Sequence, residues 1–379
     1  MVDRRVLLSG AAAMGVVGLV GCGKDSQGKD SKATPTPSTS ASSASPSATA
    51  PSTTPSTQAP VSPRVASEIA TGLDVPWGML FLASGDALVS ERNTARVLRI
   101  TPEGDVTRVG KVAGVVPPGS GGEGGLLGIA FPPGDETTLF AYITTARDNR
   151  VVTMSFDGTS LGRSRAVVTG IPTSTHHHGG RLLFADDGNL FISTGDAERS
   201  NLAQDKDSLA GKILRVDQFG DAAKGNPFGN RTWSYGHRNV EGFAFDAEGR
   251  LWATEFGNKA ADELNLIQAG KNYGWPRVEG RSDSYTNPKA TWLTSDCSPA
   301  GLAITKSTAF LGALQGRCLF GVPLDGTNAG TPEAYFADDY GRIRSVTVAP
   351  DGALWVTTSN TDGRTSPSSG DDRILRVTV

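Results

Sequence analysis

One pattern recurs six times between residue 78 and the C-terminus, and it constrains the fold more than any other feature. Each copy has an apolar segment of alternating polarity, a turn that usually contains Gly, and a second apolar segment; GMLFLASGDALVSER and RLLFADDGNLFISTGD are clear examples. Alternating apolar residues around a glycine-containing turn are typical of a β-hairpin. The copies begin at Gly78, Gly128, Arg181, Gly242, Gly301 and Ser345, and the fifth is degenerate.

The spacing of these hairpins predicts how they assemble. Copies about 45 to 60 residues apart match the length of a four-stranded propeller blade. A pair of β-sandwiches is the competing architecture, but it would not repeat one hairpin motif six times. We therefore predict an all-β, six-bladed β-propeller with four-stranded blades over residues 64–379, in which the C-terminal RILRVTV closes the ring with a segment from the start of the domain. Loops from every blade are then expected to converge at one end of the central channel.

The residues before this domain differ in composition. Residues 1–22 combine a basic start, an apolar run too short to span a bilayer, and LVGC ending in Cys22. LVGC resembles a bacterial lipobox, which predicts lipidation of Cys22 and anchoring to the outer face of the cytoplasmic membrane; an ordinary cleaved signal is the alternative. Residues 23–63 are almost entirely small and polar, so we expect a disordered tether. The export route, general secretory or twin-arginine, stays open.

Charge and cysteine content exclude some functions and leave others open. The net charge is −3 and no stripe of Lys and Arg is present, which argues against a nucleic-acid partner. Cys297 and Cys318 are the only cysteines besides Cys22. A disulfide and two separate structural thiols fit these two residues equally well.

Three of the four histidines are consecutive, His176, His177 and His178. A zinc site explains them poorly, because consecutive side chains diverge on an extended segment and no HExxH or CxxC motif accompanies them. A single histidine acting as general base fits better, because imidazole titrates near neutral pH. Asp196 ends the hairpin that begins at Arg181, so it is the candidate to orient that imidazole. A polar loop in which Asp196 caps a turn is the alternative.

Arg342 and Arg344 are two residues apart in GRIRSVTV. Alternate residues of a strand share a face, so both guanidinium groups are expected to point the same way. Two adjacent cations are unfavourable unless an anion lies near them. The pair therefore predicts an anionic ligand at the mouth of the channel.

Five motifs, in this order, resemble the glucose/sorbosone dehydrogenase family, which includes sugar dehydrogenases that use pyrroloquinoline quinone (PQQ). They are GEGGLLGIAF, HHGGRLLFADDGNLFISTGD, YGHRNVEGFAFD, DELNLIQAGKNYGWP and GRIRSVTVAPDG. The resemblance implies a six-bladed propeller with PQQ over its channel. It also implies that His177 takes the proton from the C1 hydroxyl of a sugar while a hydride passes to the quinone, with Asp196 as its acidic partner. His176 and His178 are then expected to be bystanders.

The same resemblance implies the residues that hold the cofactor and two calcium ions. Arg238 is expected beside the quinone carbonyls, where it stabilises developing charge, and bidentate arginines suit the carboxylates of PQQ. Calcium suits hard oxygen ligands, although an exposed turn is the alternative for Asp262 and Glu263. The remaining implied cofactor contacts are Glu123, Asn239, Arg342, Arg344 and, with a looser match, Arg317. The implied calcium ligands are the carbonyls of Gly257 and Asn258 at PQQ, and Asp262, Glu263 and Tyr273 at a structural site.

The leading hypothesis is a surface-anchored dehydrogenase, dependent on PQQ and Ca²⁺, that oxidises an aldose at C1 to its lactone. It would pass electrons to an external acceptor. The alternative is a non-catalytic lipoprotein whose propeller binds carbohydrate or a protein partner, because a fold does not fix a function. A calcium-dependent lactonase is a third candidate, but it would require several carboxylates converging in the channel.

Overall fold

The computed structural model describes residues 61–119 and 121–379. The predicted lipidation site Cys22 and nearly all of the predicted tether lie outside them. Within the described residues, every regular element is a β-strand except the five-residue 3-10 helix η1 (Ser200–Gln204). None of the helical segments described is long and apolar enough to cross a membrane.

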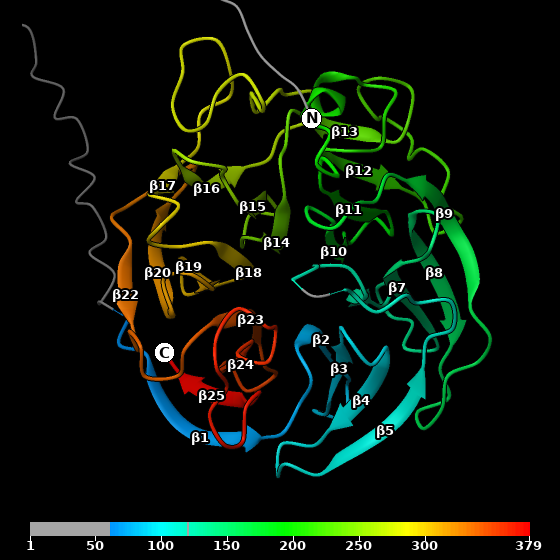
Figure 1. Ribbon diagram of the computed structural model, residues 1–379, viewed down its shortest axis with the longest axis vertical. Coiled ribbons are helices and arrows are strands. Elements are labelled where there is room, and N and C mark those ends of the chain that lie inside the picture. Colours follow the sequence, from blue (N-terminus) through cyan, green and yellow to red (C-terminus); the bar gives the residue numbers. More distant parts are fainter. Residues whose placement is uncertain (1–60, 120) are drawn as a thin grey trace, which may run out of the picture. The chain divides into compact units, whose positions relative to one another are not determined.

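The strands form six antiparallel sheets arranged in a ring (Figure 1). In five of the sheets the strand that comes first in the chain lies nearest the centre, and the others follow outward. Five blades are, in chain order: β2 (Pro76–Phe81), β3 (Ala87–Glu91), β4 (Arg96–Ile100), β5 (Val106–Lys111); β6 (Leu126–Ala130), β7 (Thr138–Thr144), β8 (Asn149–Ser155), β9 (Arg165–Ile171); β10 (Gly179–Phe184), β11 (Leu190–Thr194), β12 (Lys212–Val216), β13 (Thr232–Tyr235); β14 (Val240–Phe245), β15 (Leu251–Glu255), β16 (Asp262–Leu266), β17 (Ala290–Trp292); β18 (Pro299–Thr305), β19 (Thr308–Ala313), β20 (Cys318–Asp325), β21 (Asn328–Ala329). In the last of these, β22 (Glu333–Tyr335) also pairs with β20.

The sixth blade joins the two ends of the domain. It contains β23 (Ile343–Val348), β24 (Leu354–Thr358), β25 (Ile374–Thr378) and, as its outermost strand, β1 (Arg64–Ala70). β1 pairs antiparallel with β25, so that Val65 lies opposite Val377. The predicted closure by the C-terminal segment is therefore confirmed, and the ring has no open edge between its first and last blades. The six predicted hairpins are confirmed as the two inner strands of each blade.

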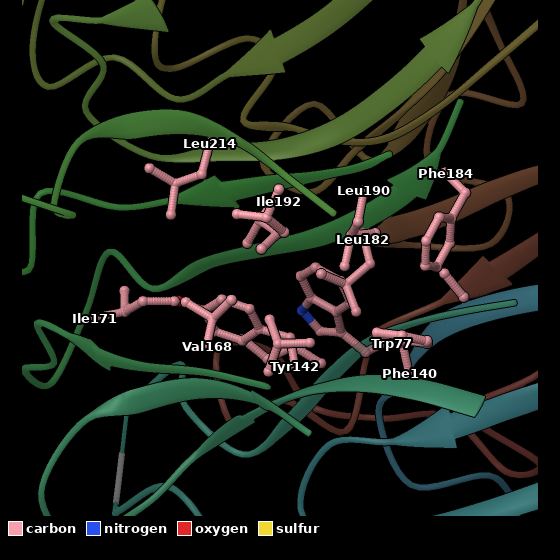
Figure 2. Packing of buried hydrophobic residues seen from close by; sticks show 14 residues of the cluster. Trp77, Phe140, Tyr142, Val168, Ile171, Leu182, Phe184, Leu190, Ile192 and Leu214 are labelled. Atoms are coloured by element: carbon pink, nitrogen blue, oxygen red, sulfur yellow. The ribbon is translucent and has the colours of Figure 1, made fainter. Parts of the chain in front are cut away.

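The core is divided among the interfaces between neighbouring blades. Six clusters of buried apolar side chains occur, each between two adjacent sheets. Figure 2 shows the cluster between the blades of β6–β9 and β10–β13, where Phe140 packs edge-on against Phe184 with ring centroids 5.0 Å apart. Because each blade is covered on both faces, strands such as β3, β11, β15 and β24 are buried along their whole length.

Every inner hairpin has a register shift at the start of its first strand. A β-bulge turns side chains away from the regular alternation. Three bulged residues, Trp77, Glu241 and Arg344, line a cavity at one end of the ring. The glycines at the bulges allow the inner strands to approach closely. A Cβ at Gly128 would lie 2.3 Å from the carbonyl oxygen of Gly180, and one at Gly242 would lie 2.3 Å from that of Ala300. This contact explains why most copies of the repeated motif begin with glycine.

Candidate active site

A cavity of about 370 Å³ lies at one end of the ring. Most of its lining comes from segments that precede the first strand or follow the second strand of the blades, and Trp77, Glu241 and Arg344 lie at the starts of first strands. The expected convergence of distant residues is confirmed. Lining residues include Trp77, Arg92, Glu123, His176, His177, Arg238, Asn239, Glu241, Phe256, Gly257, Asn258, Asp262, Gln315, Arg342, Arg344 and Arg364.

His177 is held between the cavity and a buried carboxylate. Its Nδ1 lies 2.7 Å from Oδ1 of Asp196, which is 1% exposed. Its backbone is in the left-handed region at φ 60°, and its N–H donates to Glu123 Oε2 at 2.9 Å. Gly195 makes room for this backbone, because a Cβ there would lie 1.9 Å from the His177 carbonyl oxygen. A carboxylate at Nδ1 fixes the proton on that nitrogen and leaves Nε2 as the basic atom on the cavity side.

Asp196 accepts two further hydrogen bonds. The indole Nε1 of Trp275 donates to Oδ2 at 2.8 Å, and the backbone N–H of Glu198 donates to Oδ1 at 2.9 Å. Trp275 also lies under the Arg238 guanidinium, 5.4 Å from the ring centroid. Trp275 lies at the end of the motif DELNLIQAGKNYGWP, and neither the residue pattern nor the resemblance indicated a role for it.

The two neighbouring histidines have other partners. His176 lies at the rim of the cavity, and its Nδ1 lies 3.1 Å from Glu198 Oε1, both side chains being partly exposed. His178 is buried; its Nδ1 lies 3.0 Å from Asn149 Oδ1, and burial lowers the pKa of its imidazole. The three rings therefore face three separate environments.

Arg238 and Asn239 lie beside His177 on the segment that leads into β14. The Nε of Arg238 is buried and has no acceptor among the described residues. Asn239 accepts a hydrogen bond from the Gly179 N–H at 2.8 Å and donates to Glu241 at 3.3 Å. An unsatisfied buried donor is unfavourable, so Arg238 is suited to donate to a ligand oxygen.

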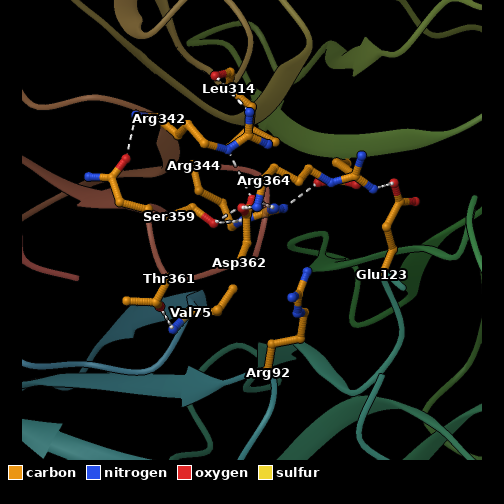
Figure 3. A network of polar contacts seen from close by, with 12 residues as sticks. Val75, Arg92, Glu123, Leu314, Arg342, Arg344, Ser359, Thr361, Asp362 and Arg364 are labelled. Carbon is orange, nitrogen blue, oxygen red and sulfur yellow. Dashed lines mark hydrogen bonds and ion pairs between the residues drawn. The ribbon is translucent and has the colours of Figure 1, made fainter. Parts of the chain in front are cut away.

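Arg342 and Arg344 lie side by side, as predicted (Figure 3), but each already has an anionic partner in the protein. Arg342 Nε lies 3.0 Å from Asp362 Oδ2, and Arg344 Nη1 lies 2.8 Å from Glu241 Oε2. Burial raises the pKa of Glu241. The charge of the pair is thus partly balanced within the protein.

Sequence reasoning missed three residues of this network, Arg92, Arg364 and Asp362. Arg364 Nη2 lies 2.8 Å from Glu123 Oε1, which joins the last blade to the segment before β6. Each of the three residues follows the second strand of a repeat, as Asp196 does. Their place after a second strand is the feature they share, but it does not set Arg92 apart from other residues at such places.

The structure does not bring Arg317 to the cavity. Its side chain is half exposed and pairs with Asp338 at 2.8 Å. Gln315, two residues earlier, lines the cavity instead. The strand β19 ends at Ala313, and the turn that follows directs Gln315 inward and Arg317 outward.

The loop after β15 fits a calcium ion at the cavity. Gly257 and Asn258 line the cavity, and their carbonyl oxygens accept no hydrogen bond from any described residue. Asp262 accepts from the Gly257 N–H at 2.8 Å and from the Ser298 N–H at 2.6 Å, and burial raises its pKa to about 6. A Cβ at Gly257 would lie 2.0 Å from the Ala261 carbonyl oxygen, so the turn requires glycine.

Asp262 and Glu263 do not face the same space, because successive strand residues point to opposite faces. Glu263 lines a second, small cavity together with Glu255 and Tyr273. Burial, followed by the charge of Glu255, raises the pKa of Glu263. The Tyr273 hydroxyl donates to the Leu266 carbonyl at 2.7 Å. Among the described residues, no group of three His, Cys, Asp or Glu side chains is placed to hold a metal ion, so a second calcium would need backbone oxygens.

Cys297 and Cys318 are both buried free thiols in the same apolar cluster. The sequence left open a disulfide or two separate structural thiols, and the structure has the two separate thiols.

Comparison with known proteins agrees with this geometry. The fold and the cavity define a six-bladed propeller with a histidine–carboxylate pair at the wall of an arginine-rich cavity. Residues 73–369 match the family described as glucose/sorbosone dehydrogenase, and the chain belongs to that family.

Several known proteins resemble this chain over most of its length. A structure described as the PQQ-bound form of an aldose sugar dehydrogenase from Streptomyces coelicolor has a TM-score of 0.80 and 45% identity, covering 83% of this chain and 97% of that one. An uncharacterised protein of Synechocystis is 33% identical, covering 79% of this chain and 85% of its own. The aldose sugar dehydrogenase YliI of Escherichia coli is 29% identical, covering 77% and 89%.

Proposed function

We propose that this protein is a PQQ-dependent aldose dehydrogenase that oxidises a sugar at C1 to the lactone, with His177 as general base. Family membership and the likeness to the PQQ-bound aldose sugar dehydrogenase of Streptomyces coelicolor support an oxidoreductase of this type. The observation that carries the proposal is the 2.7 Å contact between His177 and the buried Asp196 at the wall of an arginine-rich cavity.

The chain supplies binding, orientation and one proton transfer. Nε2 of His177 removes the proton of the sugar hydroxyl, because the hydrogen bond from Nδ1 to Asp196 directs its lone pair toward the cavity. PQQ, when bound, supplies the two-electron acceptor for the hydride. Trp275 and the Glu198 backbone fix Asp196, so the base is oriented before the substrate arrives.

The residues present fit a tricarboxylate quinone. Arg238 has a buried Nε without an acceptor, and its place beside His177 suits an oxygen of the quinone. Arg342 and Arg344 are positioned for carboxylate groups, and Asn239 and Glu123 complete the wall. The carbonyls of Gly257 and Asn258 are the proposed ligands of a Ca²⁺ ion next to PQQ. Glu263 and the backbone around Tyr273 are the proposed surroundings of a second, structural Ca²⁺.

The proposed setting is the outside of the cytoplasmic membrane. The apolar run and LVGC at the N-terminus support export and lipidation at Cys22. A Cys22→Ala variant should then move from the membrane fraction to the soluble fraction and lose incorporation of labelled fatty acid. The substrate is a soluble aldose, and the electrons leave to an external acceptor.

Reconstitution tests the enzymatic part. The purified full chain is titrated with PQQ and Ca²⁺ by calorimetry, and dye reduction is then followed with a panel of aldoses. His177→Ala should lower kcat by about 10²- to 10⁴-fold and leave the Kd for PQQ nearly unchanged. His176→Ala is the matched control from the same segment and should keep turnover within severalfold. Absence of PQQ binding would refute the cofactor, and full turnover in His177→Ala would refute the base.

A further inference from the structure

The charges that line the cavity are not balanced. Five arginines line it, while the carboxylates that line it are Glu123, Glu241 and Asp262, with Asp362 directly behind the arginine pair. Burial also raises the pKa of Glu241, which favours its neutral form. The cavity therefore has an excess of positive charge.

This excess is concentrated at particular side chains. Arg342, Arg344 and Arg364 each lie within 3.0 Å of a carboxylate oxygen. Arg92 and Arg238 are the two lining arginines that form no ion pair with any described residue. Of these two, Arg92 is the more deeply buried, at 3% exposure.

Arg92 is also rigidly held in this position. It follows β3, its N–H donates to the Val75 carbonyl at 3.1 Å, and its carbonyl accepts from the Leu126 N–H at 3.1 Å. The bond from its Nε to Asn93 Oδ1, at 3.0 Å, is the side-chain hydrogen bond it makes. Its two terminal nitrogens have no acceptor among residues 61–119 and 121–379, and Figure 3 shows the guanidinium directed toward the Arg344–Asp362 network.

A buried cation without a direct ion pair is unfavourable, because the attraction of more distant carboxylates, here Asp362, Glu241 and Glu123, offsets only part of the desolvation. A side chain fixed in this state is unfavourable to the free protein and becomes favourable when an anion binds. We propose that Arg92 is a cofactor-binding residue whose unpaired guanidinium binds a carboxylate group of the anionic ligand in this cavity. The inference rests on the proposed function, in which that ligand is PQQ.

The assignment divides the arginines into two roles. The guanidinium groups of Arg342 and Arg344 already pair with Asp362 and Glu241, so their net attraction for a ligand carboxylate is reduced. Their main role is to shape the site. Arg92 presents donors with no competing acceptor in the protein, so the ligand gains a charge-assisted bond there without breaking an existing one.

The test compares Arg92→Gln with Arg99→Gln in the full chain. Arg99 lies on β4 of the same blade, outside the cavity, and its Nε donates to Asp86 at 2.6 Å. Two quantities are measured in chloride-free buffer: the Kd for PQQ with Ca²⁺ by calorimetry, and the midpoint of thermal unfolding without PQQ. Arg92→Lys, which keeps the charge, is a second variant if glutamine disturbs folding.

Arg92→Gln should raise the Kd for PQQ tenfold or more, as expected for a lost charge-assisted bond, and should not lower the unfolding midpoint of the free protein. Arg92→Lys should recover part of the affinity. Arg99→Gln should lower the midpoint and leave the Kd unchanged.

A Kd for PQQ of Arg92→Gln within threefold of that of the unsubstituted chain would overturn the inference. A fall in its unfolding midpoint as large as that of Arg99→Gln would also overturn it, because it would indicate a structural role for Arg92. If the unsubstituted chain binds no PQQ, the proposed function fails and this inference fails with it. If it binds PQQ and Arg92→Gln binds equally well, only the inference fails.

Discussion

Replacing Asp196 by Asn tests whether the orientation of His177 is what makes it a base. Both oxygens of Asp196 accept hydrogen bonds: Oδ1 from His177 Nδ1 at 2.7 Å and Glu198 N at 2.9 Å, and Oδ2 from Trp275 Nε1 at 2.8 Å. Asparagine has nearly the same shape but replaces one acceptor by an NH₂ donor. In either orientation of the amide, a donor therefore faces a group that previously donated to the carboxylate.

The two orientations have different consequences. If the amide oxygen stays with Trp275, the NH₂ group faces His177 and moves the imidazole proton to Nε2, so the basic lone pair no longer faces the cavity. General base catalysis is worth about 10²- to 10⁴-fold in rate, and kcat should fall by that factor. If the oxygen stays with His177, the indole N–H of Trp275 loses its acceptor, which costs about 1–3 kcal/mol of stability.

The assay measures kcat in dye reduction, Kd for PQQ by calorimetry and the free energy of unfolding in urea. Asp196→Asn should lose kcat while binding PQQ almost normally. Glu198→Gln is the matched control, because it alters the parallel but partly exposed pair with His176 and should change kcat little. A kcat for Asp196→Asn within tenfold of the unsubstituted enzyme, with normal PQQ binding and an unchanged free energy of unfolding, would refute the reasoning, because neither orientation of the amide allows that combination.

Three further substitutions probe other parts of the molecule. Lys212→Met removes an ammonium group that donates to three backbone carbonyls at 2.6–3.1 Å. Urea unfolding should show a loss of about 3 kcal/mol in stability, and a loss below about 1 kcal/mol would contradict this prediction. Gly257→Ala places a Cβ 2.0 Å from the Ala261 carbonyl and should weaken Ca²⁺ binding at least tenfold by calorimetry, whereas Gly119→Ala, with open space around it, should not. The pKa of about 6 for Asp262 exceeds the ~4 of an unfolded chain, so its contribution to stability is full below pH ~4 and is lost as pH rises past 6. In calcium-free buffer the free energy of unfolding should fall by about 3 kcal/mol between pH 4 and 7, and this fall should be absent in Asp262→Asn. Equal pH dependence of stability in both proteins would show that Asp262 is not its source.

The fold was predictable because the repeat specifies it locally. Each hairpin carries its own alternation of apolar residues and its own turn, and six such units leave few architectures open. The C-terminal RILRVTV was also identifiable as the closing segment, and it pairs with β1. The register shifts were not predictable, because a bulge depends on how closely a neighbouring blade approaches rather than on the alternation within a strand.

The site was predictable in part. The resemblance to the glucose/sorbosone dehydrogenase family singled out His177 from three consecutive histidines, and the structure brings it to Asp196. The sequence could not show that Gln315 and not Arg317 faces the cavity, because the geometry of a turn decides which of two residues so close together points inward. Arg92 was missed because a lone arginine after a strand carries no local signal.

The sequence by itself determined the number of blades, the strands within them and the residue types available for chemistry, because those depend on short-range alternation and turn formation. The tertiary structure decided which charges meet. Glu241 with Arg344, Asp362 with Arg342, and Glu123 with Arg364 are separated by 103, 20 and 241 residues along the chain. Electrostatic compensation depends on distance in space, so the arginine left without a partner could be identified only after the blades had closed into a ring.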